Sequence, residues 1–261
     1  MMITIKNETI AQVPSLHVVK DTLRNEQSTP TIFFFHGFTS AKENNLHVAY
    51  LLAQKGFRVF LPDALYHGER EIEQHSENRD LAFWEIILTS IQELDAMRSE
   101  LKEKGLLCED KLGVIGTSMG AITMFGALTQ YPWIKTAVSF MGTAYYETFA
   151  YGLLETAQRR GLLVEESLQE DMLKKIKPFD LSKQLDKLDG RPLFMWHGKA
   201  DEVVPYPLSE QFYNELTTTY KQTPDNLQFM AEEKVGHKVS RTAVLKSIDW
   251  FEQHLKTKVS S

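Results

Sequence analysis

The stretch Gly116-Thr117-Ser118-Met119-Gly120 decides how this sequence is interpreted. It follows an apolar run over 111–115, which predicts a buried strand, and it precedes small residues that predict a helix. Glycine two positions before and after the serine leaves room for a sharp strand-to-helix turn, on which a hydroxyl projects above a sheet. The G-x-S-x-G pattern therefore predicts a nucleophile at Ser118. The competing interpretation is an ordinary glycine-rich turn.

Short apolar runs alternate with amphipathic stretches on both sides of this motif, which is typical of parallel strands joined by helices. The run 31–35 is continuously apolar, as expected of a strand buried on both faces. The first residues alternate weakly instead and predict three short antiparallel strands at a sheet edge. These three strands are 3–5, 10–13 and 16–19. Four further strands are predicted at 57–61, 136–141, 192–196 and 227–230. The predicted helices are 42–54, 81–104, 121–130, 208–220 and 241–255.

The alternation breaks between residues 143 and 190. This segment carries two predicted helices, 147–160 and 165–175, and no convincing strand. A loop of that length without secondary structure is uncommon in a compact domain, so the segment predicts a helical insertion. We expect a single domain over residues 1–261 with 143–190 inserted into it.

A serine hydroxyl is a poor nucleophile until a neighbouring base removes its proton. The chain order expected around this motif is serine, then acid, then histidine. Asp201 follows a predicted strand directly, and His237 lies between the last predicted strand and the last helix. Both lie in loops at the carboxyl ends of strands, where open α/β sheets bind their ligands. We predict that Asp201 orients His237 as the general base for Ser118. Glu202 is the alternative acid, and a helix-start or surface-turn carboxylate is the competing interpretation of Asp201.

The other histidines fit supporting or solvated roles. His36, beside Gly37, is expected to brace its own loop, and His197 to shape the turn that holds Asp201. Four more are expected at the surface or in solvent: His17, His47, His75 and His254.

Acyl transfer also needs hydrogen-bond donors aimed at the developing oxyanion, usually backbone N–H groups. One comes from the residue after the nucleophile, here Met119, and the other from a loop after an early strand. The loop that follows the strand 31–35 offers the N–H of Phe38, with Thr39 as the alternative. No H-E-x-x-H pattern or spaced Cys/His set is present, so we expect neither a metal nor a cofactor.

Bulk properties narrow the class of partner. A net charge of −6 argues against nucleic acid, because such binding relies on clustered Lys and Arg. Cys108 is the only cysteine, so no intramolecular disulfide forms, which fits a reducing compartment. The amino terminus lacks the pattern of a signal peptide, and no apolar run approaches the ~18 residues of a membrane span. We expect a cytoplasmic protein without a membrane partner.

Taken together, these segments resemble the α/β-hydrolase superfamily, and they are most similar to small bacterial esterases near the dienelactone-hydrolase and prolyl-oligopeptidase-like branch. The resemblance implies the α/β-hydrolase fold, a mostly parallel eight-stranded sheet flanked by helices. It also implies a triad of Ser118, Asp201 and His237, and a cap after the sixth strand, which 143–190 matches. The matching segments are His-Gly-Phe-Thr-Ser at 36–40, Pro-Asp-Ala-Leu-Tyr-His-Gly at 62–68, Gly-Thr-Ser-Met-Gly at 116–120, His-Gly-Lys-Ala-Asp at 197–201 and Gly-His at 236–237.

One segment departs from that pattern. Residues 63–70 resemble a D-x-x-x-H-G-x-S loop, but Glu69 and Arg70 replace the small residues at its end. Asp63 and His67 are expected to order this loop.

The predicted function is that of a carboxylesterase, a serine hydrolase that cleaves small-molecule esters through an acyl-enzyme. A neutral histidine base implies that activity falls as the pH drops through about 6.5, where an ordinary histidine titrates. The alternatives are a serine peptidase of the prolyl-oligopeptidase-like type and a non-catalytic binding module. Six aromatic residues near the expected site indicate a partly apolar pocket, although packing explains them equally well: Phe38, Tyr66, Tyr145, Tyr146, Phe149 and Tyr151.

Overall fold

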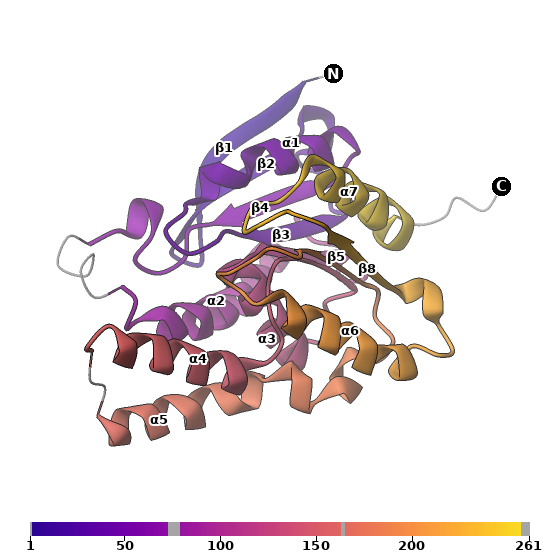
Figure 1. The fold of residues 1–261 in the computed structure, drawn as a ribbon. Coiled ribbons are helices and arrows are strands. Elements are labelled where there is room, and N and C mark those ends of the chain that lie inside the picture. The colour runs from indigo at the N-terminus through magenta and orange to yellow at the C-terminus, as the bar shows by residue number, and fades with distance from the viewer. Residues whose placement is uncertain (1, 73–78, 163–164, 257–261) are drawn as a thin grey trace.

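A single sheet of eight strands forms the centre of the molecule (Figure 1). The computed structural model describes residues 2–72, 79–162 and 165–256. The strands lie in the order β1-β2-β4-β3-β5-β6-β7-β8. They are β1 (Ile3–Ile10), β2 (Val13–Lys20), β3 (Thr31–Phe35), β4 (Arg58–Pro62), β5 (Leu112–Thr117), β6 (Thr136–Phe140), β7 (Leu193–Gly198) and β8 (Leu227–Glu232).

From β4 to β8 every neighbouring pair is parallel, and β2 is antiparallel to both of its neighbours. All five residues of β3 are buried, as the apolar run predicted. Phe35 of β3 pairs with Gly116 of β5, so the loops that leave these two strands start side by side. The predicted fold, a mostly parallel eight-stranded sheet flanked by helices, is confirmed.

The prediction of three short strands at the amino terminus is wrong, because residues 3–20 form one long hairpin. Ala11 and Gln12, with φ of 48° and 66°, make its two-residue turn. The polar residues between 6 and 9 suggested a break in the sequence. In the structure they belong to an edge strand, where exposed polar side chains cost little.

Helices cover both faces of the sheet (Figure 1). Helices α1 (Leu46–Gln54) and α7 (Arg241–Leu255) lie on one face, and α2 (Phe83–Glu103), α3 (Met119–Gln130) and α6 (Tyr206–Thr219) lie on the other. Short 3₁₀ helices are η1 (Asp21–Leu23), η2 (Lys42–Asn45), η3 (Gly68–Arg70) and η8 (Pro224–Asn226). The predicted helix 42–54 therefore opens with a 3₁₀ turn.

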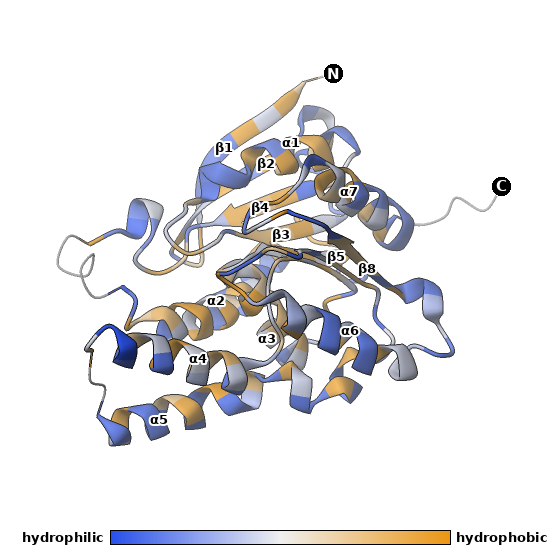
Figure 2. Ribbon diagram, in the orientation of Figure 1, coloured by the Kyte–Doolittle hydropathy of each residue, from blue (hydrophilic) through white to orange (hydrophobic). Residues whose placement is uncertain are grey.

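Alternate residues of the central strands feed two separate cores. Phe33 and Phe35 pack with α2, α3 and α6, whereas Ile32 and Phe34 pack with α1 and α7. Figure 2 shows the hydrophobic colour along β3 and β4. This alternation fixes which way each strand faces and therefore which loops meet at the carboxyl edge.

The segment between β6 and β7 contains no strand within its described residues. It holds α4 (Tyr146–Arg159) and α5 (Glu166–Ile176), followed by η5 (Lys177–Phe179), η6 (Leu181–Lys183) and η7 (Leu185–Leu188). Helices α4 and α5 lie outside α2 and α3 (Figure 1). The hydroxyl of the fully buried Tyr146 donates to the Ile122 carbonyl of α3 at 2.6 Å, which fastens α4 to the helix that follows the serine. In the part of the chain that the structure describes, no helix is long and apolar enough to cross a membrane.

The prediction that His17 lies at the surface is wrong. It belongs to β2, inside the sheet, and its ring stacks on Phe60 of β4 with centroids 4.5 Å apart. Burial lowers the pKa of His17 to about 4. His254 is half-buried against Trp250, with ring centroids 4.1 Å apart, His47 is exposed as predicted, and His75 lies outside the described residues.

Candidate active site

The G-x-S-x-G segment forms the predicted sharp turn between β5 and α3. Ser118 has φ 54° and ψ −117°, a strained conformation for a residue with a side chain, and its N–H donates to the Phe140 carbonyl at 2.8 Å. A Cβ on Gly116 would lie 2.1 Å from the Gly120 carbonyl oxygen, and one on Gly120 would lie 2.2 Å from that of Phe35. Both positions therefore require glycine, and the turn lifts the hydroxyl out of the sheet.

The three residues predicted to act together meet at the carboxyl edge of the sheet. Nε2 of His237 lies 2.9 Å from Oγ of Ser118, and Nδ1 of His237 lies 2.7 Å from Oδ2 of Asp201. With a neutral ring, Nδ1–H donates to the carboxylate and Nε2 accepts the serine proton. This arrangement can increase the nucleophilicity of the hydroxyl.

Asp201 is held by donors on both carboxylate oxygens. Oδ1 accepts from the N–H groups of Val203 and Val204 at 2.9 and 3.1 Å, and Oδ2 faces the rings of His237 and His197. Burial by itself would raise the pKa of Asp201. The hydrogen bonds from the two histidines and from Val203 outweigh burial and hold that pKa well below its usual range. Asp201 is therefore an anion with a fixed orientation, whereas Glu202, the alternative acid, is exposed.

The carboxyl-end loops also supply backbone donors beside the serine. Met119 opens α3, where N–H groups have no partner inside the helix. Over the described residues, no hydrogen bond is found for the N–H of Met119 or for that of Phe38. The N–H of Thr39, the alternative donor, is already directed at Nε2 of His67 at 3.2 Å. Of the two predicted donors, Thr39 therefore has its N–H engaged, whereas that of Phe38 is not.

Two buried histidines join the loop that contains Phe38 to the loop after β4. Nε2 of His36 accepts from the Ala64 N–H at 3.0 Å, and Nε2 of His67 accepts from Thr39. Burial lowers the pKa of His36 to about 4 and that of His67 below its usual value, so both rings are neutral acceptors at neutral pH. Thr39 has a φ of 58°, and the hydrogen bond that its N–H donates to His67 helps to hold this strained residue. The bracing role predicted for His36 agrees with these contacts.

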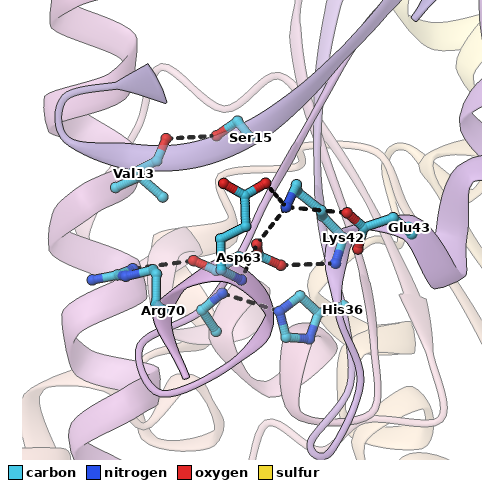
Figure 3. Close-up of polar contacts among 9 residues, drawn as sticks. Val13, Ser15, His36, Lys42, Glu43, Asp63 and Arg70 are labelled. Atoms are coloured by element: carbon cyan, nitrogen blue, oxygen red, sulfur yellow. Dashed lines mark hydrogen bonds and ion pairs between the residues drawn. The ribbon is translucent and has the colours of Figure 1, made fainter. Parts of the chain in front are cut away.

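A buried ion cluster centred on Asp63 lies between the loop that contains Phe38 and the loop after β4 (Figure 3). Nζ of Lys42 lies 2.7 Å from Oδ2 of Asp63 and 2.8 Å from Oε1 of Glu69, and the backbone N–H groups of Lys42 and Glu69 donate to the same carboxylate at 3.0 Å each. Burial lowers the pKa of Lys42, but its hydrogen bonds with Asp63, Glu69 and Glu43 outweigh burial and raise that pKa above its usual value. Asp63 was predicted to order the loop after β4, whereas the contribution of Lys42 was not predicted.

Arg70 completes this region. It donates to the Asp63 carbonyl at 3.1 Å and pairs with both carboxylate oxygens of Glu93 on α2, at 2.9 and 2.7 Å. Glu69 and Arg70 replace the small residues of the D-x-x-x-H-G-x-S pattern. They therefore provide ionic contacts of the loop after β4.

The six aromatic residues expected near the site do not all line one pocket. Tyr146 is fully buried and Tyr151 is exposed, so neither faces a shared pocket. Phe38 lies edge-on to Phe83 of α2 with centroids 5.6 Å apart, and Phe83 lies 6.0 Å from Phe149 of α4. This chain of rings links the loop that contains Phe38 to α4 of the inserted segment. Among the described residues, no three His, Cys, Asp or Glu side chains form a group that could hold a metal ion.

Known proteins share this architecture and sequence. The chain matches the prolyl oligopeptidase family over residues 44–258. It is 45% identical to YitV of Bacillus subtilis, which is named as a candidate esterase, over 97% of this chain and the whole of that protein. It is 33% identical to the esterase YjfP of Escherichia coli over the same shares. The crystal structure of TT1662 from Thermus thermophilus superposes with a TM-score of 0.77 at 21% identity, covering 99% of this chain and all of that one.

The sheet, its helices and the serine turn define an α/β-hydrolase. The chain belongs to the prolyl oligopeptidase family. The family-level resemblance in the sequence is thereby confirmed.

Proposed function

We propose that this protein is a serine hydrolase that cleaves carboxylic esters through an acyl-enzyme on Ser118. The observation that carries the proposal is the continuous hydrogen-bonded chain from Ser118 through His237 to Asp201, beside two unpaired backbone N–H groups. Two relatives named as esterases, each matched over its whole length, support an ester as the substrate.

In the first half of the reaction, Oγ of Ser118 attacks the acyl carbonyl carbon while Nε2 of His237 accepts the hydroxyl proton. The carbonyl oxygen gains negative charge and accepts hydrogen bonds from the N–H groups of Phe38 and Met119. The carboxylate of Asp201 stabilises the imidazolium that forms on His237. Collapse of the tetrahedral intermediate expels the alcohol, which takes its proton from His237.

In the second half, water replaces the alcohol. His237 removes a proton from the water as it attacks the acyl-enzyme, the same two N–H groups hold the oxyanion, and Ser118 recovers its proton as the acid leaves. His237 must be neutral at the start of both halves, so the rate falls at acidic pH.

We further propose that the whole chain is one domain and that residues 143–190 act as a cap over the acyl site. The support is the row of rings from Phe38 through Phe83 to Phe149, which connects the inserted helices to the loop after β3. An apolar wall of this kind favours a modest, uncharged acyl group. A cytoplasmic location stays a prediction from the sequence.

The test compares wild type with Ser118→Ala on nitrophenyl esters of increasing acyl length and on matched thioesters. Ester hydrolysis by wild type and a loss in kcat on the order of 10⁶-fold in the variant are expected. Covalent labelling by a fluorophosphonate should likewise disappear in Ser118→Ala. A folded wild type that neither hydrolyses esters nor takes up the label would favour a non-catalytic binding module.

The second candidate is a serine peptidase, because the matched family is that of prolyl oligopeptidases. Aminoacyl nitroanilides assayed beside the esters separate the two. Higher kcat/KM on the anilides than on every ester would replace the esterase proposal with the peptidase.

A further inference from the structure

His197 is the penultimate residue of β7, its side chain is fully buried, and both of its ring nitrogens have partners. Nε2 lies 3.1 Å from Oδ2 of Asp201 and 2.9 Å from the Val204 carbonyl oxygen. Nδ1 lies 2.7 Å from Oγ of Ser209, and that hydroxyl oxygen lies 3.0 Å from the Gly142 carbonyl oxygen.

Counting hydrogens fixes the charge of this ring. Both partners of Nε2 are acceptors, so Nε2 carries a hydrogen. Ser209 has one hydroxyl hydrogen, and the Gly142 carbonyl can only accept it. The hydroxyl oxygen of Ser209 is then the acceptor for Nδ1, which must also carry a hydrogen. A neutral ring would instead leave two oxygens 3.0 Å apart with no hydrogen between them.

We propose that His197 is a permanently protonated partner of Asp201, and that its positive charge sets the pH at which His237 becomes a base. A buried cation requires a counter-charge, and the carboxylate of Asp201 supplies it. His197 is thus a positioning residue that acts on the reaction through Asp201. The kinetic consequence of this inference rests on the proposed function. The charge of the His197 ring is independent of that function.

The consequence follows from the shared oxygen. Oδ2 of Asp201 contacts His197 and His237 together. A lone carboxylate would favour protonation of His237, because an opposite charge within about 4–6 Å stabilises the charged form. The positive ring of His197 offsets that attraction, so His237 stays neutral, and able to accept a proton, at lower pH.

Three neighbouring ionisable side chains bear on the charge of His197. The titratable groups facing His197 are Asp201 from its own loop, His237 from the loop after β8, and the ring of Tyr206 on α6, with centroids 6.0 Å away. Burial and Glu210 raise the pKa of Tyr206 to about 12, so that ring is uncharged in the working range. The loop after β6 contributes the carbonyl of Gly142, which is uncharged and accepts a hydrogen bond from Ser209.

The kinetic test uses His197→Gln. A glutamine amide can still donate to Asp201 but carries no charge. We expect the acid limb of the kcat/KM profile on a nitrophenyl ester to move to higher pH by about one unit, which is roughly a tenfold loss at acidic pH, with a plateau above pH 8 within a few-fold of wild type. His254→Gln, which replaces a half-buried histidine on α7, is the matched control and should leave the limb in place. An unmoved limb in His197→Gln would overturn the kinetic part of the proposal.

A direct measurement covers the case in which His197→Gln does not fold. In wild type labelled with ¹⁵N-histidine, long-range ¹H–¹⁵N spectra should show one ring with both nitrogens protonated from pH 5.5 to 8.5. Ser209→Ala should perturb that ring, which assigns it to His197. A ring in this position that is neutral with a single hydrogen at Nε2 would refute the proposal even if ester hydrolysis is intact. If ester hydrolysis is absent while the ring is doubly protonated, the proposed function fails and the charge assignment stands.

Discussion

Replacing Lys42 by methionine removes a charge beside the loop that contains Phe38 and leaves the carboxylate of Asp63 buried. Nζ of Lys42 lies 2.7 Å from Oδ2 of Asp63, and neither side chain is exposed. Methionine keeps an unbranched apolar stem of similar length, so the change isolates the ammonium group. Asp63 keeps its backbone donors from residues 42 and 69 but loses its counter-charge.

The expected cost follows from that geometry. Removing one partner of a buried ion pair destabilises a protein by about 3–5 kcal/mol. The lower end, about 3 kcal/mol, applies here because the Glu69 side chain is 57% exposed and brings the cluster close to water. At an unfolding entropy of about 2.1 cal/mol/K per residue over 261 residues, that loss lowers Tm by about 5 °C.

Thermal unfolding followed by circular dichroism at pH 7 measures this loss. The matched control is Lys55→Met, an exposed lysine whose Nζ lies 2.6 Å from Oε2 of Glu252, and its Tm should stay within about 1 °C of wild type. The double variant Lys42→Met/Asp63→Asn should recover part of the loss, because an amide needs no counter-charge. If Lys42→Met unfolds at the same temperature as Lys55→Met, the buried pair does not stabilise the loop.

Three further predictions concern the serine turn, the sheet and the inserted helices. Gly120→Ala should abolish activity and soluble folded protein, because its Cβ would lie 2.2 Å from a backbone oxygen, whereas Gly152→Ala, whose Cβ meets nothing within 4 Å, should fold normally. Burial lowers the pKa of His17 to about 4, so between pH 4 and 6.5 the unfolded chain binds more protons than the folded one. The folded state therefore loses stability as the pH drops through that window. In His17→Phe, which keeps the stack on Phe60, Tm should fall less steeply with decreasing pH. Tyr146→Phe removes a 2.6 Å hydrogen bond and should cost about 1 kcal/mol, or about 2 °C in Tm; an unchanged Tm would show that this bond does not fasten α4.

Periodicity and glycine spacing predicted the fold because the central strands are buried on both faces. The run 31–35 is apolar throughout and reads as a strand without ambiguity. The hairpin of residues 3–20 was mispredicted because an edge strand tolerates polar residues that otherwise signal a turn. His17 was misassigned for the same reason, since its strand was taken as peripheral.

The candidate site was predictable where chain order restricts the chemistry. Ser118, Asp201 and His237 were chosen by motif and order, and the structure brings them within hydrogen-bonding distance. Lys42 and the proposed charge on His197 were not predictable, since the first depends on a contact with Asp63 and the second on the contacts of Ser209 with His197 and the Gly142 carbonyl. A lysine at the start of an amphipathic stretch ordinarily indicates solvent exposure, and only the coordinates reveal its burial.

The placement of β8 and the loop behind it has a consequence for synthesis. His237, the proposed base, comes after all eight strands of the sheet in the chain. A nascent chain that has not yet reached residue 237 contains Ser118 and Asp201 but lacks the imidazole that lies between them. Ester hydrolysis by a nascent chain would therefore begin only after β8 and the loop that follows it have left the ribosome. Activity during translation would thus report that the sheet is complete.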